Sequence, residues 1–391
     1  MKQNIARSTA LEIMMEFADL TGLSGAEKSP RRYLWTDAFA VCNFLEFYNQ
    51  TDDEKYKHLA LRLVDQVHSV LGRHREDDER TGWISGLNEQ EGKMHPAKGG
   101  LRIGKMMNER KPSGSFNEYL EWDRDGQYYH YLTKWMHALN RVSRVTGDPT
   151  YNTWAIELAK TAHAGFTYVP PSGGKKRMYW KMSIDLSWPL VQSMGHHDPL
   201  DGFITYNQLR ATANKDPKKS ARPDLTKEIS DMADICEGQN WVTDDLLGIG
   251  DLLCNAFKVA QLITSSDLEQ TSLLETLLDS SLPGLESCMR DNPLKLPAAY
   301  RLAFRELGLS IGLHAVEKMR GLAGQSSGPF KKKGPLNSRI ESLMQYALLG
   351  ETIEAFWLER GNREADTWTS HRDINMVMLA TSLAPDGYLT L

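Results

Sequence analysis

Apolar residues follow helical spacing along almost the whole chain. The stretch from Tyr33 to Phe47 is apolar nearly all round, which is typical of a buried helix. The next stretch, Glu54 to Leu71, carries apolar residues about one helical turn apart among Lys, Arg, Asp and His: Leu59, Leu63, Val67 and Val70. That pattern predicts a half-exposed, amphipathic helix.

The same alternation of buried and half-exposed helices continues to the end of the chain and gives six pairs. The buried members are expected at about 33–49, 126–145, 185–195, 243–264, 298–322 and 367–383. The half-exposed members are expected at about 5–20, 53–71, 149–168, 201–214, 267–281 and 337–360. A further helix is expected at 224–238. The chain is therefore predicted to be all-α.

A direct repeat supports the pairing. Residues 51–56 align with residues 146–151 at an offset of 95, so that Asp53 matches Asp148 and Tyr56 matches Tyr151. In each copy the Asp is expected to cap the following helix, and Pro149 suits the first turn of its helix. A weaker copy begins at His197, at a further offset of 50.

Two segments depart from the helical pattern. Residues 166–171 and 177–182 flank Gly173-Gly174 and predict a short hairpin. Residues 72–125 are rich in Gly, Asn and charge and predict a long loop. Loops of that length inside compact domains are usually functional.

The six helix pairs, together with the pattern Thr-Gly-Asp-Pro-x-Tyr-x-x-x-Ala at 146–155, resemble the six-hairpin glycosidase superfamily. The resemblance covers nearly the whole chain. It implies a single (α/α)6 toroid domain over 1–391, with 72–125 as a rim loop. It also implies an active site at the N-terminal ends of the inner helices. Glycoside hydrolases and N-acylglucosamine 2-epimerase-like enzymes share this fold, so the fold alone does not fix the function.

An aromatic residue sits beside a charged one near the start of each predicted inner helix. The six are Trp35 with Asp37, Trp122 with Asp123 and Asp125, Trp188 with Asp185, Trp241 with Asp244 and Asp245, Tyr300 with Arg301, and Trp368 with Asp373. If the resemblance holds, these clusters face one funnel. Aromatic faces suit sugar rings, and carboxylates suit their hydroxyls. Trp35, Trp122, Trp188, Trp241 and Trp368 are therefore expected to form sugar-stacking walls.

The richest cluster ends the long loop and contains Glu121, Asp123 and Asp125. Three carboxylates within five residues repel each other, which favours a raised pKa for one of them. Such an acid beside Trp122 could protonate a leaving oxygen. The alternative is that Asp123 or Asp125 caps the next helix.

A second carboxylate is expected from Asp37 or from Asp244 and Asp245. Both groups have a structural alternative, because acids in the first turn of a helix are common caps and Asp37 could pair with Arg31 or Arg32.

Histidines offer a different chemistry. His130, His196 and His371 are candidates for proton transfer, and His371 with Arg372 could bind substrate. His137 is expected to be a hydrogen-bonded core residue. His196-His197-Asp198 contains good metal ligands, but no fourth ligand stands at a recognisable spacing. The repeat places this string at an inner-to-outer turn, on the face away from the funnel. The alternative is that the loop dips inward, because the third inner helix is short and is broken by Pro189.

Composition narrows the class of protein. The 391 residues are 41% hydrophobic and 25% charged with a net charge of −5, which gives no reason to expect a nucleic-acid partner. The run Lys331-Lys332-Lys333 is expected to be a solvated loop. Four scattered cysteines without a CxxC pair favour a reduced, cytoplasmic location. The chain opens without a signal-peptide core, no apolar run predicts a membrane span, and no P-loop, GxGxxG, HExxH or GxSxG motif is present.

These patterns together predict a carbohydrate-active enzyme, most simply a glycoside hydrolase with two carboxylates. Its partner would be a small-molecule or oligosaccharide substrate, with no cofactor and no metal. A sugar epimerase or isomerase with a histidine pair is the first alternative. A non-catalytic toroid that binds a glycan or a protein is the second. The oligomeric state does not follow from the sequence.

Overall fold

The computed structural model describes residues 2–25, 30–215, 224–325 and 334–391. Helices account for 66% of the residues, which confirms the all-α prediction. The Lys331–Lys333 run lies outside the described residues. The chain forms two compact units, one of residues 18–239 and one of residues 1–17 with 240–391. We call them the central unit and the terminal unit. The expectation of one domain over 1–391 stays a prediction.

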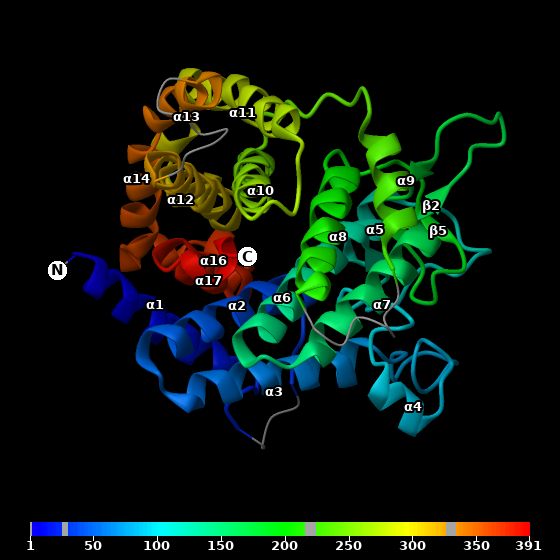
Figure 1. Cartoon of the computed structure of the whole chain (residues 1–391). Coiled ribbons are helices and arrows are strands. Elements are labelled where there is room, and N and C mark those ends of the chain that lie inside the picture. Colours follow the sequence, from blue (N-terminus) through cyan, green and yellow to red (C-terminus); the bar gives the residue numbers. More distant parts are fainter. Residues whose placement is uncertain (1, 26–29, 216–223, 326–333) are drawn as a thin grey trace. The chain divides into compact units, whose positions relative to one another are not determined.

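The elements of the central unit run in chain order from the blue to the green part of Figure 1. Its helices are α2 (Leu34–Thr51), α3 (Glu54–Leu71), α4 (Glu89–Met94), α5 (Glu118–Asp123), α6 (Tyr129–Thr146), α7 (Pro149–Phe166), α8 (Asp198–Asn214) and α9 (Thr226–Cys236). Its strands are β1 (Gln127–Tyr128), β2 (Thr167–Tyr168), β3 (Arg177–Met178), β4 (Lys181–Met182) and β5 (Pro189–Val191).

Three helix pairs build the central unit. Helices α2, α6 and α8 pack in a row, and α3, α7 and α9 each pack on the preceding member of that row. The inner helices are buried along most of their length: every residue from Leu34 to Phe47 of α2 is buried, as is every residue from Asp198 to Leu209 of α8. Helix α3 buries only one stripe. The first two pairs match the predicted ones.

The third predicted pair is wrong. No helix forms at 185–195, where β4 and β5 pair antiparallel on either side of a tight turn. Asp185 favours this turn because its carboxylate accepts a hydrogen bond from the Ser187 amide at 3.1 Å, and Leu186 adopts φ 60°. Pro189 then lacks the amide proton that a helix interior needs. Helix α8, predicted as the outer member, takes the inner position and α9 becomes its partner.

The sequence repeat corresponds to the same turn built twice. Asp53 accepts a hydrogen bond from the Lys55 amide at 3.0 Å, and Asp148 accepts one from the Thr150 amide at 2.9 Å. The preceding residue is left-handed in both copies, with φ 55° at Asp52 and φ 73° at Gly147. Both predicted caps are therefore confirmed.

The predicted hairpin is also present. Strands β2 and β3 pair antiparallel, with Thr167 opposite Met178. Gly173 and Gly174, both at positive φ, turn the chain between them. A separate sheet of order β1-β4-β5 joins the start of α6 to the segment before α8.

The terminal unit contains three more inner helices. Its longer helices are α1 (Lys2–Leu20, which passes into the central unit after Phe17), α10 (Leu246–Thr264), α11 (Thr271–Asp291), α12 (Ala303–Gln325), α13 (Pro335–Met344), α14 (Leu348–Leu358) and α16 (Arg372–Leu383). Its short ones are η2 (Pro293–Lys295), η3 (Ala298–Tyr300), η4 (Arg360–Glu364), α15 (Asp366–Thr369) and α17 (Asp386–Leu389). Helices α10, α12 and α16 pack in a row, with α11 on α10, and α13 and α14 on α12. The outer helix predicted at 337–360 is two helices.

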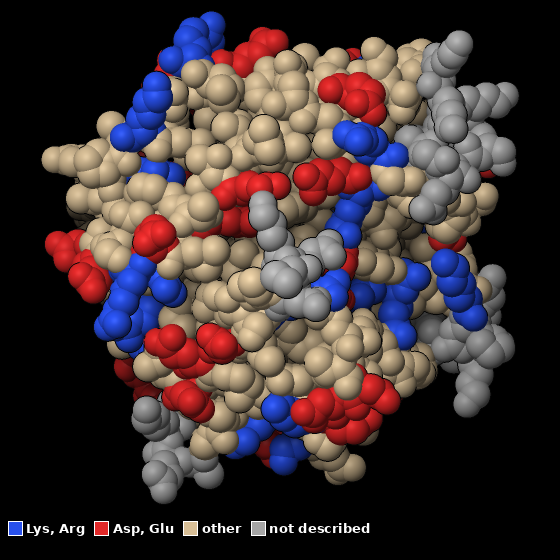
Figure 2. Space-filling model, turned by 90° about the vertical axis from the view of Figure 1, so that its left-hand side faces the viewer, with Lys and Arg blue, Asp and Glu red and all other residues tan. Residues whose placement is uncertain are grey.

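Helix α10 is long and apolar enough to cross a membrane, the one such helix found among the described residues. Its most apolar window is 67% buried inside the protein, as expected for a core helix. Figure 2 shows acidic and basic side chains interspersed over one face of the molecule. This mixture agrees with the small net charge of −5.

Candidate active site

The three inner helices of the central unit begin side by side. Tyr33 precedes α2, and its hydroxyl lies 2.8 Å from that of Tyr131 in the first turn of α6. In the same turn, Nδ1 of His130 lies 3.5 Å from Oδ1 of Asp198, the first residue of α8. The first two aromatic-and-charge clusters of the sequence therefore meet at one end, which we call the α2–α6–α8 end.

Aromatic rings form a continuous cluster at this end. Trp122 lies nearly parallel to Tyr128 with 6.4 Å between ring centroids, and Tyr128 stacks on His130 at 5.4 Å. Tyr131 lies 5.2 Å from Tyr128, and Trp35 lies 6.5 Å from Tyr131. Of these rings, those of Trp122, His130 and Tyr131 belong to partly exposed residues. They offer an apolar face beside polar atoms, the combination that a sugar ring binds.

The tyrosines of the cluster stay protonated at neutral pH. Burial raises the pKa of Tyr33 to about 12 and raises the pKa of Tyr128 above its usual value. The Tyr128 hydroxyl is buried and has no hydrogen-bond partner among the described residues. Both phenols can therefore act as hydrogen-bond donors but not as bases.

Asp125 is held by four contacts and is fully buried. Its Oδ2 accepts hydrogen bonds from Arg102 at 3.0 Å and from Arg75 at 3.2 Å. Its Oδ1 accepts from the Gly104 amide at 3.0 Å and the Gly126 amide at 3.1 Å. This carboxylate joins the long loop to the start of α6, and no oxygen is left over for a substrate.

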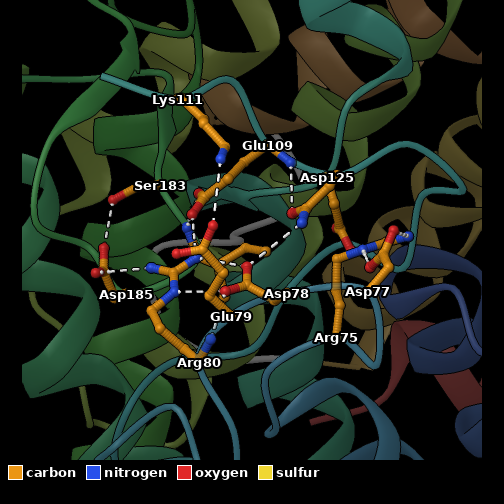
Figure 3. A network of polar contacts seen from close by, with 12 residues as sticks. Arg75, Asp77, Asp78, Glu79, Arg80, Glu109, Lys111, Asp125, Ser183 and Asp185 are labelled. Atoms are coloured by element: carbon orange, nitrogen blue, oxygen red, sulfur yellow. Dashed lines mark hydrogen bonds and ion pairs between the residues drawn. The ribbon is translucent and has the colours of Figure 1, made fainter. Parts of the chain in front are cut away.

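A second ion-pair network holds the loop against the β4–β5 turn (Figure 3). The Arg80 guanidinium donates to Asp78 at 2.8 Å, to Asp185 at 2.9 Å and to Glu109. Glu109 in turn accepts a hydrogen bond from the Ile184 amide at 2.5 Å. The charged residues of the long loop at 72–125 were interpreted from the sequence as a sign of function. In the structure, many of them hold the loop in place.

Asp37 also has a structural position. It lies in the first turn of α2, is 1% exposed, and its Oδ2 accepts a hydrogen bond from the Tyr33 amide at 2.9 Å. Its Oδ1 pairs with Arg32 at 3.3 Å. These contacts are those of a helix-start carboxylate that neutralises a buried arginine.

Glu121 combines burial with an unused oxygen. It is 1% exposed, and its Oε1 accepts a hydrogen bond from Nε of Arg110 and lies 3.5 Å from Arg124. Its Oε2 is buried and has no partner among the described residues. An unpaired buried acceptor costs about 1–3 kcal/mol, and more when it is charged. A ligand that donates a hydrogen bond here would recover that cost.

Glu121 lines a cavity of about 530 Å³ that we call the aromatic cavity. Its walls come from α5, the loop before it and the β4–β5 region: Arg110, Phe116, Glu118, Glu121, Trp122, Trp180, Pro189, Leu190, Val191, Gln192 and Ser193. Trp188 stands behind this wall, with the Arg110 guanidinium 4.7 Å from its ring centroid. Trp188 therefore packs on a paired arginine.

Lys181 reinforces the floor of this region. Its Nζ donates to the carbonyl oxygens of Glu121 and Arg124, the latter at 2.7 Å, and lies 5.3 Å from the Tyr128 ring centroid. Burial lowers its pKa to about 8, although nearby carboxylates oppose that shift. The side chain is fully buried, so its contacts are structural.

Asp123 differs from the other acids of its cluster. It is exposed and lines a cavity of about 520 Å³ together with Tyr33, Gly104, Lys105, Met106 and Met107. Within the described ranges its carboxylate forms no hydrogen bond or ion pair. Lys105 donates to the Trp122 carbonyl, and burial lowers the pKa of this lysine. Of the three clustered acids, Asp123 is the one whose whole carboxylate is exposed and has no protein partner among the described residues.

The His196-His197-Asp198 string does not lie away from the helix starts, and that sequence-based placement is wrong. Because α8 is an inner helix, its first residue, Asp198, faces His130 at the α2–α6–α8 end. The Asp198 side chain is 5% exposed, and its Oδ2 has no partner among the described residues. The rings of His196 and His197, just before it, lie 4.6 Å apart and are tilted by 52°.

A polar seam continues from this point down the interface of α6 and α8. Lys134 pairs with Asp201 at 3.0 Å, and Nδ1 of His137 lies 3.0 Å from Oε1 of Gln208. All four side chains are buried. The prediction that His137 is a hydrogen-bonded core residue is confirmed.

In the terminal unit, the inner helices also begin together. Asp245 caps α10 by accepting from the Gly248 amide at 3.2 Å and pairs with Arg305 of α12 at 2.6 Å. The His371 ring, before α16, lies 5.6 Å from that of Phe304 on α12. The contacts of Asp245 are therefore those of a helix cap, which was the structural alternative for this residue.

The remaining candidate site residues of the terminal unit are either buried tryptophans or exposed charged residues. Trp241 and Trp368 are buried, and Trp368 stacks on Trp357 at 5.5 Å. Asp244 and Arg372 are exposed and form no hydrogen bond or ion pair within the described part of the chain. The structure does not relate these residues to those of the central unit, so a funnel shared by all six clusters stays a prediction.

Among the described residues, no group of three or more His, Cys, Asp and Glu side chains could hold a metal ion. No disulfide is present among the described residues. Sequence reasoning missed the pairing of His130 with Asp198, the unused oxygen of Glu121 and the contribution of Trp180. The sequence gives little signal for the first, because buried polar residues such as Asp201, Asn207 and Gln208 interrupt the apolar positions of α8.

Neither a protein-family model nor a curated protein sequence matches the chain. Solved structures do. A sugar epimerase from a ruminal bacterium matches with a TM-score of 0.50 and 9% identity over 98% of each chain. Cellobiose 2-epimerase from Spirochaeta thermophila matches with a TM-score of 0.46 and 11% identity, over 90% of this chain and 86% of that one. An unsaturated glucuronyl hydrolase specific for heparin matches with a TM-score of 0.33 and 12% identity, over 71% and 83%.

The match to the sugar epimerase spans both chains from end to end and shows the fold. With its alternating inner and outer helices, this chain has an (α/α)6 fold.

Proposed function

We propose that the protein is a carbohydrate-active enzyme whose reacting site is the α2–α6–α8 end of the central unit. The reaction we infer is proton transfer at a carbon of a free sugar, as in an epimerase or isomerase. The observation that carries this inference is the pair formed by His130 and Asp198. The aromatic rings around this pair supply a surface for the sugar ring.

The pair has the arrangement of a general base. Oδ1 of Asp198 lies 3.5 Å from Nδ1 of His130, so the carboxylate favours a proton on Nδ1 and leaves Nε2 as the acceptor. The His130 side chain is 29% exposed and can therefore reach a ligand. Removal of the proton beside a sugar carbonyl gives an enediolate, and return of a proton to the opposite face gives the epimer. The second proton donor would be His196, two residues before Asp198.

The charges around the site suit an uncharged sugar with many hydroxyls. The Tyr33 and Tyr128 phenols are protonated, and a phenol can stabilise the enediolate oxygen by donating a hydrogen bond. Asp123 is free to accept from a sugar hydroxyl. The proposed substrate is a small-molecule sugar or oligosaccharide, used without cofactor or metal. Four cysteines scattered along the chain without a CxxC pair support a reduced intracellular location.

To test this, the purified protein is incubated with free aldoses and disaccharides, and new sugars are detected by chromatography. We expect epimer or ketose formation that falls by about 100-fold or more in His130→Gln, within the range assigned to general base catalysis. Asp198→Asn should reduce it as well, with an altered pH profile. Turnover that is unchanged in both variants would contradict the assignment.

A glycoside hydrolase is the second candidate, and Asp123 favours it. This carboxylate is exposed beside a cavity of about 520 Å³ and is free of protein partners within the described ranges. It would act with Glu121 or Asp37 of the same unit as the second carboxylate. Release of nitrophenol from aryl glycosides that is lost in Asp123→Asn but kept in His130→Gln would establish hydrolysis instead.

A further inference from the structure

We propose that the aromatic cavity is an accessory sugar-binding site that takes one neutral sugar ring. It lies beside the proposed reacting site and shares Trp122 with it. The inference rests on the proposed function only for the class of ligand, and its residues play no part in the proton transfer.

The walls of the cavity offer a corner for a ring. Trp122 and Trp180 meet edge to face, with 5.0 Å between ring centroids and 71° between planes. Both side chains are only partly buried and both line the cavity. Phe116, which is 59% exposed, stands on the outer side. The apolar face of a sugar packs on such rings while its hydroxyls point elsewhere.

Glu121 supplies the polar contact. Its carboxylate is buried, one oxygen is bonded to Arg110, and the other, Oε2, lacks a partner among the described residues. Buried carboxylate oxygens are normally paired, so this atom indicates a missing donor. A hydroxyl of a ligand in the cavity would provide it.

The surrounding charges select a neutral ligand. Arg110 contacts Oε1 of Glu121, and Arg124 lies 3.5 Å from the same atom, so the carboxylate charge is already matched. An ammonium group would meet these two cations, and an anionic group would meet Glu118 and Glu121. A polyhydroxyl ring avoids both penalties.

Trp122 links the two sites. One wall of the aromatic cavity is Trp122, and the same ring lies nearly parallel to Tyr128, which stacks on His130. The bound ring could be the second ring of the substrate or a separate glycan. The two sources share one chemistry, and the experiment separates them.

The test measures binding of glucose, cellobiose and maltose by calorimetry to Trp180→Ala, Glu121→Gln and Phe116→Ala in the full chain. We expect at least one sugar to bind about 10-fold or more weakly to Trp180→Ala and Glu121→Gln, from the loss of a stacking surface or of one charge-assisted hydrogen bond. If Trp180→Ala does not fold, Phe116→Ala tests the stacking surface instead, because Phe116 is exposed. Tyr179→Ala is the matched control, because Tyr179 stacks on Tyr168 outside this cavity.

If the ring belongs to the substrate, the KM of the disaccharide rises in Trp180→Ala relative to that of the monosaccharide. If it is a separate glycan, the two KM values keep their ratio and only binding falls. Binding by His130→Gln should keep its dependence on Trp180 even though turnover is lost, so the two proposals fail separately. Sugar binding equal to wild type in Trp180→Ala, Glu121→Gln and Phe116→Ala would overturn the accessory site.

Discussion

Replacement of Asp125 by Ala should destabilise the protein rather than remove a catalytic group. The carboxylate is fully buried and accepts hydrogen bonds from two arginines and two backbone amides. Removing one member of a buried ion pair costs about 3–5 kcal/mol, since the partner charges stay behind. The lower part of that range applies here because Arg75 and Arg102 keep other acceptors and are partly exposed.

The assay is thermal unfolding followed by circular dichroism. At roughly 2 °C per kcal/mol for a unit of this size, the Tm should fall by about 6–8 °C. Asp123→Ala is the matched control, since that neighbouring side chain is exposed and should shift the Tm by less than about 1 °C. An Asp125→Ala protein with wild-type Tm and no turnover would refute the structural role and restore Asp125 as a catalytic acid.

Two further predictions concern stability. Burial opposes the charge of His314, but hydrogen bonds to Glu317 and Glu354 outweigh it and raise its pKa to about 9. The histidine should therefore stabilise the fold by about 3 kcal/mol below pH 6.5 and lose that contribution as the pH rises through about 9; urea unfolding of wild type and His314→Asn should converge at pH 10, and parallel pH profiles would contradict this. Gly104→Ala should cost at least about 2 kcal/mol, because φ is +94° and the new Cβ would lie 2.2 Å from the Arg32 carbonyl oxygen. Gly147→Ala, at φ +73° with open space around it, should cost only about 1–2 kcal/mol, and equal losses would contradict the steric argument.

The helix pairs were predictable because burial and helical spacing coincide in most of them. The helix caps formed by Asp53 and Asp148 were also predictable, because a short polar side chain directly before a helix usually accepts a hydrogen bond from an amide of its first turn. The third pair was not. A Pro at position 189 weakened the helical reading there, but the choice between a broken helix and a strand turn depends on contacts of Asp185 that spacing does not reveal.

The candidate site was predictable in its location within each unit and not in its chemistry. A run of acids such as Glu121, Asp123 and Asp125 looks uniform in sequence. The structure separates them into a buried acid with one open oxygen, an exposed acid and a fully bonded one. The path of the long loop determines which arginine pairs with which acid. The local sequence pattern does not predict that path.

The central claim, that His130 with Asp198 transfers a proton at a sugar carbon, is tested most directly by deuterium uptake. The protein is incubated in D₂O with a panel of free aldoses, and loss of the C2 proton signal is followed by NMR. The account predicts uptake at C2 for at least one sugar with the wild-type protein and none with His130→Gln. No uptake from any aldose, together with Asp123-dependent cleavage of a glycoside, would contradict it.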